Sequence, residues 1–308
     1  MKFLATLYRS PQTRGGLIIL TLVLAIALCA PLLSPEDPYQ VNPNARLLPP
    51  LATSQLSAAS GATSQGATSQ GAKSQGATAQ RATSERHLLG TDSVGRDTLS
   101  RLIYGSRLSL TVGFLAVVLS ALFGTLVGAV SGYFGGWLES ASGWLIDVQL
   151  SFPFLLLAIF LLGALGGGTL AVVLVLALGT WVNYARIVRA QVLSIRNQGY
   201  VEAARATGAG AARVLFLHVL PNTLAPICVV ASFSMAQAIL TEAALSFLGV
   251  GLDPSTPSWG TMLNDGRDYL VSAWWIATMP GIAIGVTVLG VTLFGDGLRE
   301  LLDPRGLR

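Results

Sequence analysis

Six long runs of apolar residues divide the chain and are separated by polar segments of very unequal length. The runs cover about 17–33, 108–131, 144–165, 169–188, 224–249 and 273–295. A helix needs about 17–25 mostly apolar residues to cross roughly 30 Å of hydrocarbon, and each run reaches that length. The pattern therefore predicts an all-α polytopic membrane protein with six transmembrane helices.

Composition supports a membrane protein over a soluble one. Charged residues make up only 11% of the chain, against about 25% in soluble domains. The first run follows a positively charged N-terminus, as a signal peptide would, but Pro31 stands directly after the candidate cleavage residue Ala30. We therefore interpret 17–33 as a retained first helix. The arginines are scattered between the runs rather than gathered in one stripe, so no nucleic-acid partner is expected.

Lysine and arginine set the expected orientation, because short cytoplasmic segments of membrane proteins carry an excess of both. Positive residues gather before the first run, between Arg186 and Arg213, and after the last run. The short segments 166–168 and 250–272 hold only Arg267. The segment 34–107 is also rich in arginine, but long loops are largely exempt from the rule. The pattern predicts both termini in the cytoplasm, an N-in/C-in arrangement.

The long segment contains a tandem repeat that cannot build a core. The stretch GATSQGATSQGAKSQGATAQRATSE, Gly61–Glu85, repeats every five residues, and its phase extends back to Leu51. Small polar residues bury too little apolar area to offset chain entropy. We expect the repeat 51–85 to be a flexible extracytoplasmic spacer. A stalk that binds glycans or docks a receptor is the alternative.

The segment between the fourth and fifth runs is helix-forming but too polar to span a membrane. It reads GYVEAARATGAGAARVLFLHVLPN, Gly199–Asn222. We predict two short helices that meet at Gly208, where glycine permits positive φ, and an entry to the fifth helix at Pro221. Small alanines leave a low-relief surface on which another protein can pack. An ordinary connecting loop is the alternative.

Acidic residues outside this segment are candidates for catalytic or metal-binding sites. Asp92 and Asp97 flank Arg96 in GTDSVGRD, and we expect ion pairs with Arg96 or Arg101 there, because no nucleophile or histidine cluster accompanies them. No catalytic site is expected. The two histidines, at 87 and 218, fall on opposite sides in the predicted topology, so no metal site is expected either.

Two further acids fall in or near apolar runs, where ionisable groups are costly and often functional. Asp147 lies near the predicted cytoplasmic start of the third helix and is expected to reach the interface. Glu242 lies in the outer half of the fifth helix. It either lines the outer mouth of a pathway or makes a structural hydrogen bond to a neighbouring helix.

The polar segment after the fourth run resembles the EAA motif of permease subunits in bacterial ABC importers. The motif is matched by Glu202, Ala203 and Ala204, then Gly208, then Leu220 and Pro221. His218 stands where the general pattern has isoleucine, which resembles the peptide and nickel branch. Three other segments are similar to the C-type permease of that branch, namely Leu89–Leu110, Leu245–Leu263 and Leu293–Arg305.

The resemblance implies a type I ABC importer permease fold in the bacterial cytoplasmic (inner) membrane, crossing it several times. It divides the chain into a cytoplasmic N-terminus 1–16, a first transmembrane helix 17–33, an extracytoplasmic loop 34–107, a five-helix core 108–295 with a cytoplasmic EAA coupling loop 190–222, and a cytoplasmic tail 296–308. The repeat falls outside every matching segment, which favours a lineage-specific insertion.

The resemblance also implies the partners and the site. Its ATPase-coupling residues are Glu202, Ala203, Ala204, Gly208, Leu220 and Pro221; residues of the substrate pathway are left unassigned. The implied partners are a second permease subunit, two cytoplasmic ATPases and an extracytoplasmic binding protein. The chain itself is expected to be no enzyme and to bind no cofactor, since it has no G-x-x-x-x-G-K-[ST] loop, and ATP and magnesium would bind the partners.

Di- or oligopeptides are the expected cargo, and nickel or glutathione are the alternatives within the family. A secondary transporter is the alternative from another class, but it is expected to show internal repeats and interrupted helices at the midplane. We see no such duplication in the sequence. A receptor or scaffold without transport would need no cytoplasmic docking loop.

Overall fold

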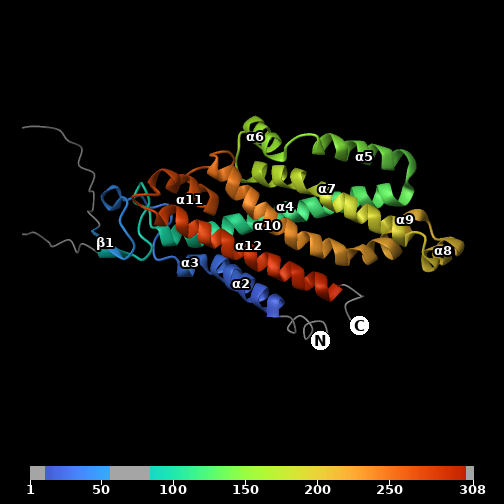
Figure 1. Ribbon diagram of the computed structural model, residues 1–308, viewed down its shortest axis with the longest axis horizontal. Helices are drawn as coiled ribbons and strands as arrows, with labels where there is room; N and C mark the ends of the chain where they lie inside the picture. The colour runs from blue at the N-terminus through green and yellow to red at the C-terminus, as the bar shows by residue number, and fades with distance from the viewer. Residues whose placement is uncertain (1–10, 56–83, 303–308) are drawn as a thin grey trace, which may run out of the picture.

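The computed structural model describes residues 11–55 and 84–302 and arranges its long helices side by side in one elongated bundle (Figure 1). The longer helices are α2 (Pro11–Leu28), α4 (Thr98–Phe134), α5 (Gly136–Leu150), α6 (Phe154–Leu165), α7 (Thr169–Ile195), α10 (Leu224–Phe247) and α12 (Trp275–Leu302). The shorter helices are α3 (Ala30–Leu33), α8 (Gly199–Ala206), α9 (Ala211–Val214) and α11 (Trp259–Gly266). Two strands, β1 (Ala52–Gln55) and β2 (Ser84–His87), lie near one end.

Among the described residues, five helices are long and apolar enough to span a membrane, and the bent pair α5 and α6 makes a sixth span if it is counted as one. This agrees with the predicted six, but most bounds differ. α4 begins at Thr98 rather than 108, because the Asp97 side chain accepts a hydrogen bond from the Ser100 amide and caps the helix. α7 and α12 also continue beyond 188 and 295. Hydropathy marks the membrane-embedded part of a helix, whereas the backbone ladder continues through polar residues.

The first and third spans are interrupted where single helices were predicted. α2 ends at Leu28, and Cys29 separates it from α3. The predicted span 144–165 is a broken one, because α5 and α6 meet at 89°. The break falls at Pro153, which has no amide hydrogen to donate and caps the start of α6 instead of continuing α5. α5 also begins at Gly136, well before 144.

Close contact between α4 and α7 depends on glycines spaced four residues apart on α4. A Cβ placed on Gly124 or Gly128 would press into the backbone carbonyls of Trp181 and Ala185 on α7. A Cβ on Gly132 would lie 3.0 Å from the Arg189 carbonyl oxygen. Small residues at this spacing let two transmembrane helices approach closely, so this stripe fixes the position of α7.

The start and the end of the repeat pair with each other in a short antiparallel ladder. β1 pairs with β2, with Ala52 opposite His87 and Gln55 opposite Ser84. Residues 52–55, at the start of the repeat, are therefore paired as a strand rather than free. The remaining repeat residues, 56–83, lie outside the described part of the chain, so the spacer assignment stays a prediction.

Glu242 and Asp147, the two acids in or near the predicted spans, have different surroundings. Glu242 is fully buried and accepts hydrogen bonds from Ser109 on α4, at 3.1 Å, and from Ser246, at 3.0 Å. This matches the structural alternative rather than the mouth of a pathway. Asp147 does not lie near the start of its helix, because α5 begins at Gly136; it is exposed on the surface of the subunit near the end of α5.

Candidate functional site

The EAA segment folds into two short helices at the end of the bundle opposite β1 (Figure 1). α8 and α9 join α7 to the helical segment that leads into α10. The predicted pair of helices meeting at Gly208 is confirmed. α9 begins the candidate span Ala211–Phe247, whereas α8 precedes that span and has one side open to the surroundings.

Gly208 ends α8 in a left-handed conformation. Its φ is +84°, the region that glycine adopts without a steric penalty. The Ala209 amide donates to the Ala204 carbonyl at 3.2 Å, and the Gly208 amide donates to the Arg205 carbonyl at 2.9 Å. These two bonds form a Schellman motif, which satisfies carbonyls at the end of a helix. A Cβ at Gly208 would meet nothing within 4 Å, so the requirement for glycine comes from the backbone alone.

A small apolar core fixes the helix pair to the bundle. Val201, Val214 and Leu215 are buried together with Val188 and Val192 of α7. Burial of such side chains stabilises the packing by about 1.5–3 kcal/mol each.

Cation–π contact adds a second attachment. The Arg205 guanidinium lies 5.1 Å from the centre of the Tyr133 ring, near the end of α4. Arg205 therefore attaches α8 to α4, as the apolar core attaches it to α7.

The residues predicted to contact the ATPases divide into an exposed and a supporting group. Glu202, Ala203, Gly208 and Pro221 are exposed, whereas Ala204 and Leu220 are half-buried against the apolar core of the loop.

Glu202 is the charged member of the exposed group. Arg205 lies one helical turn away, at a spacing that permits an ion pair. That ion pair is absent from the described structure, in which Glu202 has no ion-pair partner within 4 Å.

Pro221 reshapes the helical segment before α10. α9 continues as a π-helix over Leu215–Val219 and then as a 3₁₀-helix over Leu220–Thr223. Proline cannot donate to the carbonyl four residues earlier and crowds it. The backbone hydrogen bonds therefore change from the α-helical spacing to the wider π spacing and then to the tighter 3₁₀ spacing. Pro221 therefore acts on the backbone that links the exposed pair to α10, in addition to being exposed itself.

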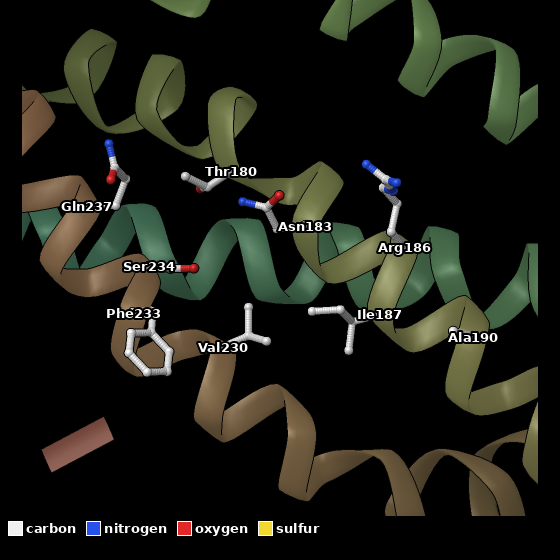
Figure 2. Close-up of a pocket in the computed structure, with 9 residues that line it drawn as sticks. All are labelled: Thr180, Asn183, Arg186, Ile187, Ala190, Val230, Phe233, Ser234 and Gln237. Atoms are coloured by element: carbon white, nitrogen blue, oxygen red, sulfur yellow. The ribbon is translucent and has the colours of Figure 1, made fainter. Parts of the chain in front are cut away.

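A groove of about 660 Å³ runs between α7 and α10 (Figure 2). Its lining combines apolar residues with uncharged polar side chains and one arginine. The lining residues are Thr180, Asn183, Arg186, Ile187, Ala190, Val230, Phe233, Ser234 and Gln237. Sequence reasoning left these positions unassigned. The signal that marks them is the recurrence of polar residues at helical spacing within apolar runs.

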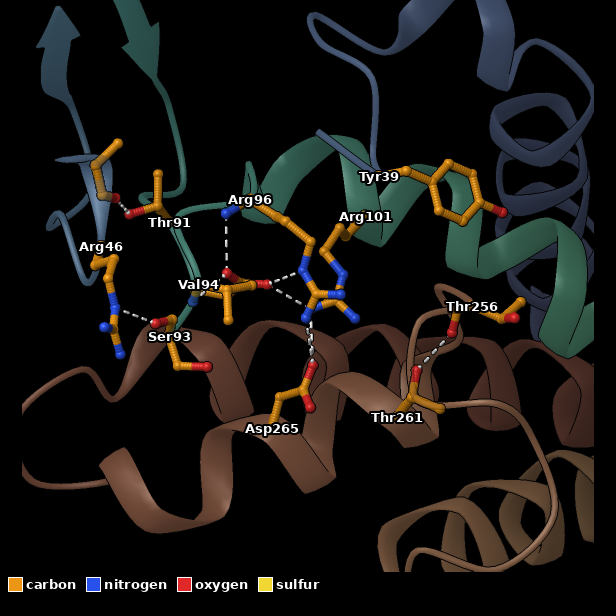
Figure 3. Close-up of polar contacts among 12 residues, drawn as sticks. Tyr39, Arg46, Thr91, Ser93, Val94, Arg96, Arg101, Thr256, Thr261 and Asp265 are labelled. Carbon is orange, nitrogen blue, oxygen red and sulfur yellow. Dashed lines mark hydrogen bonds and ion pairs between the residues drawn. The ribbon is translucent and has the colours of Figure 1, made fainter. Parts of the chain in front are cut away.

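An ion-pair network lies where the start of α4 meets α11 (Figure 3). Asp92 Oδ2 accepts from Arg96 Nε and from Arg101 Nη1, both at 2.6 Å. Asp265 of α11 accepts from Arg96 at 3.1 Å and from Arg101 at 2.8 Å. The predicted ion pairing of Asp92 is confirmed. Asp97 is not part of this network; it caps α4 and contacts His87.

Comparison with known families gives two matches. Residues 124–307 match the model described as the binding-protein-dependent transport system inner membrane component. Residues 3–50 match the N-terminal TM domain of oligopeptide transport permease C. The first match includes the EAA segment and the groove, and the second includes α2 and α3.

Curated relatives align over nearly the whole chain. The dipeptide transport system permease protein DppC of Escherichia coli is 43% identical, with 94% of this chain and 88% of the relative covered. The di/tripeptide permease DppC of Pseudomonas aeruginosa is 40% identical, with 94% and 87% covered. The dipeptide permease DppC of Haemophilus influenzae is 39% identical, with 96% and 92% covered.

A solved structure has the same fold. The inward-facing MetNI methionine ABC transporter aligns with a TM-score of 0.55 and 20% identity, covering 67% of this chain and 97% of that one. This supports the predicted type I permease fold. With family, relatives and fold in agreement, the chain belongs to the binding-protein-dependent transport system inner membrane components, multi-pass permease subunits of the cytoplasmic membrane that are transport proteins rather than enzymes.

Proposed function

We propose that the chain is one of two permease subunits of an ATP-driven importer and carries di- or oligopeptides across the cytoplasmic membrane. The cargo follows from the names of relatives that are 39–43% identical over nearly their whole length. Nothing in the site favours nickel, glutathione or a secondary transporter. An extracytoplasmic binding protein delivers the peptide, and two cytoplasmic ATPases hold the ATP and magnesium.

The exposed side of α8 docks into an ATPase. The observation that carries this proposal is that Glu202 and Ala203 are exposed on a helix whose opposite side is fixed to α7 by Val201 and Val214. A rigid attachment of this kind transmits closure of the ATPases to the spanning helices. Glu202, which has no ion-pair partner among the described residues, then makes a charge-assisted contact with a basic group of the ATPase.

The groove between α7 and α10 lines half of the translocation pathway. Peptide groups need hydrogen-bond partners wherever water is excluded, and Asn183, Ser234 and Gln237 offer uncharged donors and acceptors there. The second permease supplies the other wall. This geometry requires the N-in/C-in orientation, with α8 in the cytoplasm and β1 outside.

A bulky side chain on the exposed face tests the proposal. Ala203→Trp leaves the packed side of α8 untouched, so the subunit should insert normally but lose copurification of the ATPases and uptake of a labelled dipeptide. Ser255→Trp, exposed in the segment between α10 and α11, is the matched control and should retain both. Normal copurification with Ala203→Trp would exclude α8 as the docking helix.

A further inference from the structure

Three side chains from separate segments converge beside the start of α4. Glu36 follows α3, His87 ends β2, and Asp97 precedes α4. His87 Nδ1 lies 3.1 Å from Asp97 Oδ1 and 3.3 Å from Glu36 Oε1. One donor atom from each side chain lies within 4.8 Å of the others. The three side chains are 14%, 1% and 2% exposed, in the order Glu36, His87, Asp97, so the donors meet in a nearly closed space.

The distances fit a shared metal ion. Zinc binds imidazole nitrogen and carboxylate oxygen at about 2.0–2.2 Å. An ion at that distance from both His87 Nδ1 and one carboxylate oxygen would have an angle of roughly 100° between the two bonds. This angle lies between those of octahedral and tetrahedral coordination. His87 can therefore share one ion with each carboxylate. The two carboxylate oxygens, which lie within 4.8 Å of each other, must come within about 4.4 Å of each other to bind the same ion.

A surrounding shell of hydrogen bonds holds two of the ligands in place. The Ser100 amide and hydroxyl both donate to Asp97 Oδ2 at 2.8 Å, which leaves Oδ1 directed at His87. The Glu36 amide donates to the Ser100 hydroxyl at 3.1 Å, so the segment that carries Glu36 is tied to the same serine. Metal-ligating carboxylates are typically oriented by second partners of this kind.

Charge balance also favours a cation. Glu36 and Asp97 bring two carboxylates to a nearly buried site, and buried carboxylates in proteins are paired, hydrogen-bonded or bound to a metal. The N-terminus of α4 adds about half a positive charge. A divalent cation balances both carboxylates.

We propose that Glu36, His87 and Asp97 form a zinc site. The mixture of one imidazole and two carboxylates suits zinc better than calcium or magnesium, which prefer oxygen ligands alone. A bound ion would connect the end of β2 and the segment after α3 to the start of α4. The sequence predicted no metal site because its two histidines lie far apart; this site needs only one of them.

The test is zinc binding by the full-length chain, purified in detergent with a tag that contains no histidine. The protein is stripped with a chelator, dialysed against micromolar zinc and analysed for bound metal. The wild type should bind one zinc per chain, and His87→Gln and Asp97→Asn should bind none. His218→Gln is the matched control, since it changes the other histidine, and it should bind zinc as the wild type does.

Because a buried variant can fail to fold, Glu36→Gln is the second test. Its side chain is partly exposed, and the variant should elute as the wild type does on size exclusion. Zinc should raise the melting temperature of the wild type but not that of Glu36→Gln. Absence of bound zinc in the wild type would overturn the proposed site. Equal binding by the wild type and all variants would also overturn the site. Neither outcome touches the proposed transport function.

Discussion

A substitution at Gly208 separates the effect of backbone geometry from that of side-chain contact in the EAA segment. Gly208 and Gly210 are both exposed, and an added Cβ at either position meets nothing within 4 Å. They differ in the backbone, since φ is +84° at Gly208 and −64° at Gly210. Gly208→Ala and Gly210→Ala therefore add the same atom in similar surroundings, and only the first is strained.

The expected magnitude follows from the left-handed conformation. A non-glycine residue there costs about 1–2 kcal/mol, whereas alanine at φ −64° adds no backbone strain. Both variants gain the same entropic benefit from a less flexible unfolded chain, so the benefit cancels in the comparison. At about 1.4 kcal/mol per factor of ten, Gly208→Ala should reduce the population of the native loop relative to its alternatives by roughly 5–30-fold.

The assay compares ATPase copurification and dipeptide uptake of the two variants at equal subunit abundance in the membrane. Gly208→Ala should weaken both, because the Schellman motif that ends α8 must open or strain. Gly210→Ala should match the wild type. Equal behaviour of the two variants would refute the reasoning, since it would mean that the turn at Gly208 is not needed for coupling.

Three further predictions concern the rest of the chain. Gly128→Ala should destabilise the subunit by about 1–3 kcal/mol through overpacking against α7, measured as a lower melting temperature, whereas Gly143→Ala, in open space, should not. Arg101→Gln should cost up to about 3–5 kcal/mol and lower membrane abundance, because it removes the buried one of the two arginines that balance Asp92 and Asp265; the exposed Arg267→Gln should be neutral. Deletion of 56–83 with a short glycine linker should leave uptake unchanged, since β1 and β2 remain; loss of the assembled importer would show that the repeat is structural.

Much of the architecture was predictable because it depends on local features of the sequence. Apolar runs long enough to span the membrane indicated six spans, and the glycine at 208 indicated a left-handed turn. The ion pairing of Asp92 followed from the arginines close to it in sequence. Each of these signals lies within a few residues of the feature that it predicts.

Features that depend on distant partners could not be predicted in the same way. The broken third span follows from the packing of α5 on α4 and of α6 on α7 as well as from Pro153. Asp265 joins Arg101 from far along the chain, and no local pattern connects them. The glycine stripe on α4 was visible in the sequence, but its partner helix was not. The groove between α7 and α10 likewise becomes apparent only when two separate runs lie side by side.

Site-specific cross-linking tests the central claim most directly. In a chain with Cys29→Ser and Cys228→Ser, a cysteine is placed at Ala203 on α8 or, as the control, at Tyr39 near the opposite end, where the side chain is also exposed. A short bifunctional thiol reagent is then added to membranes that contain the whole importer. The account predicts that Ala203→Cys cross-links to an ATPase subunit and that Tyr39→Cys does not. Cross-linking of Tyr39→Cys to the ATPase, with none from Ala203→Cys, would contradict both the coupling role of α8 and the orientation of the chain.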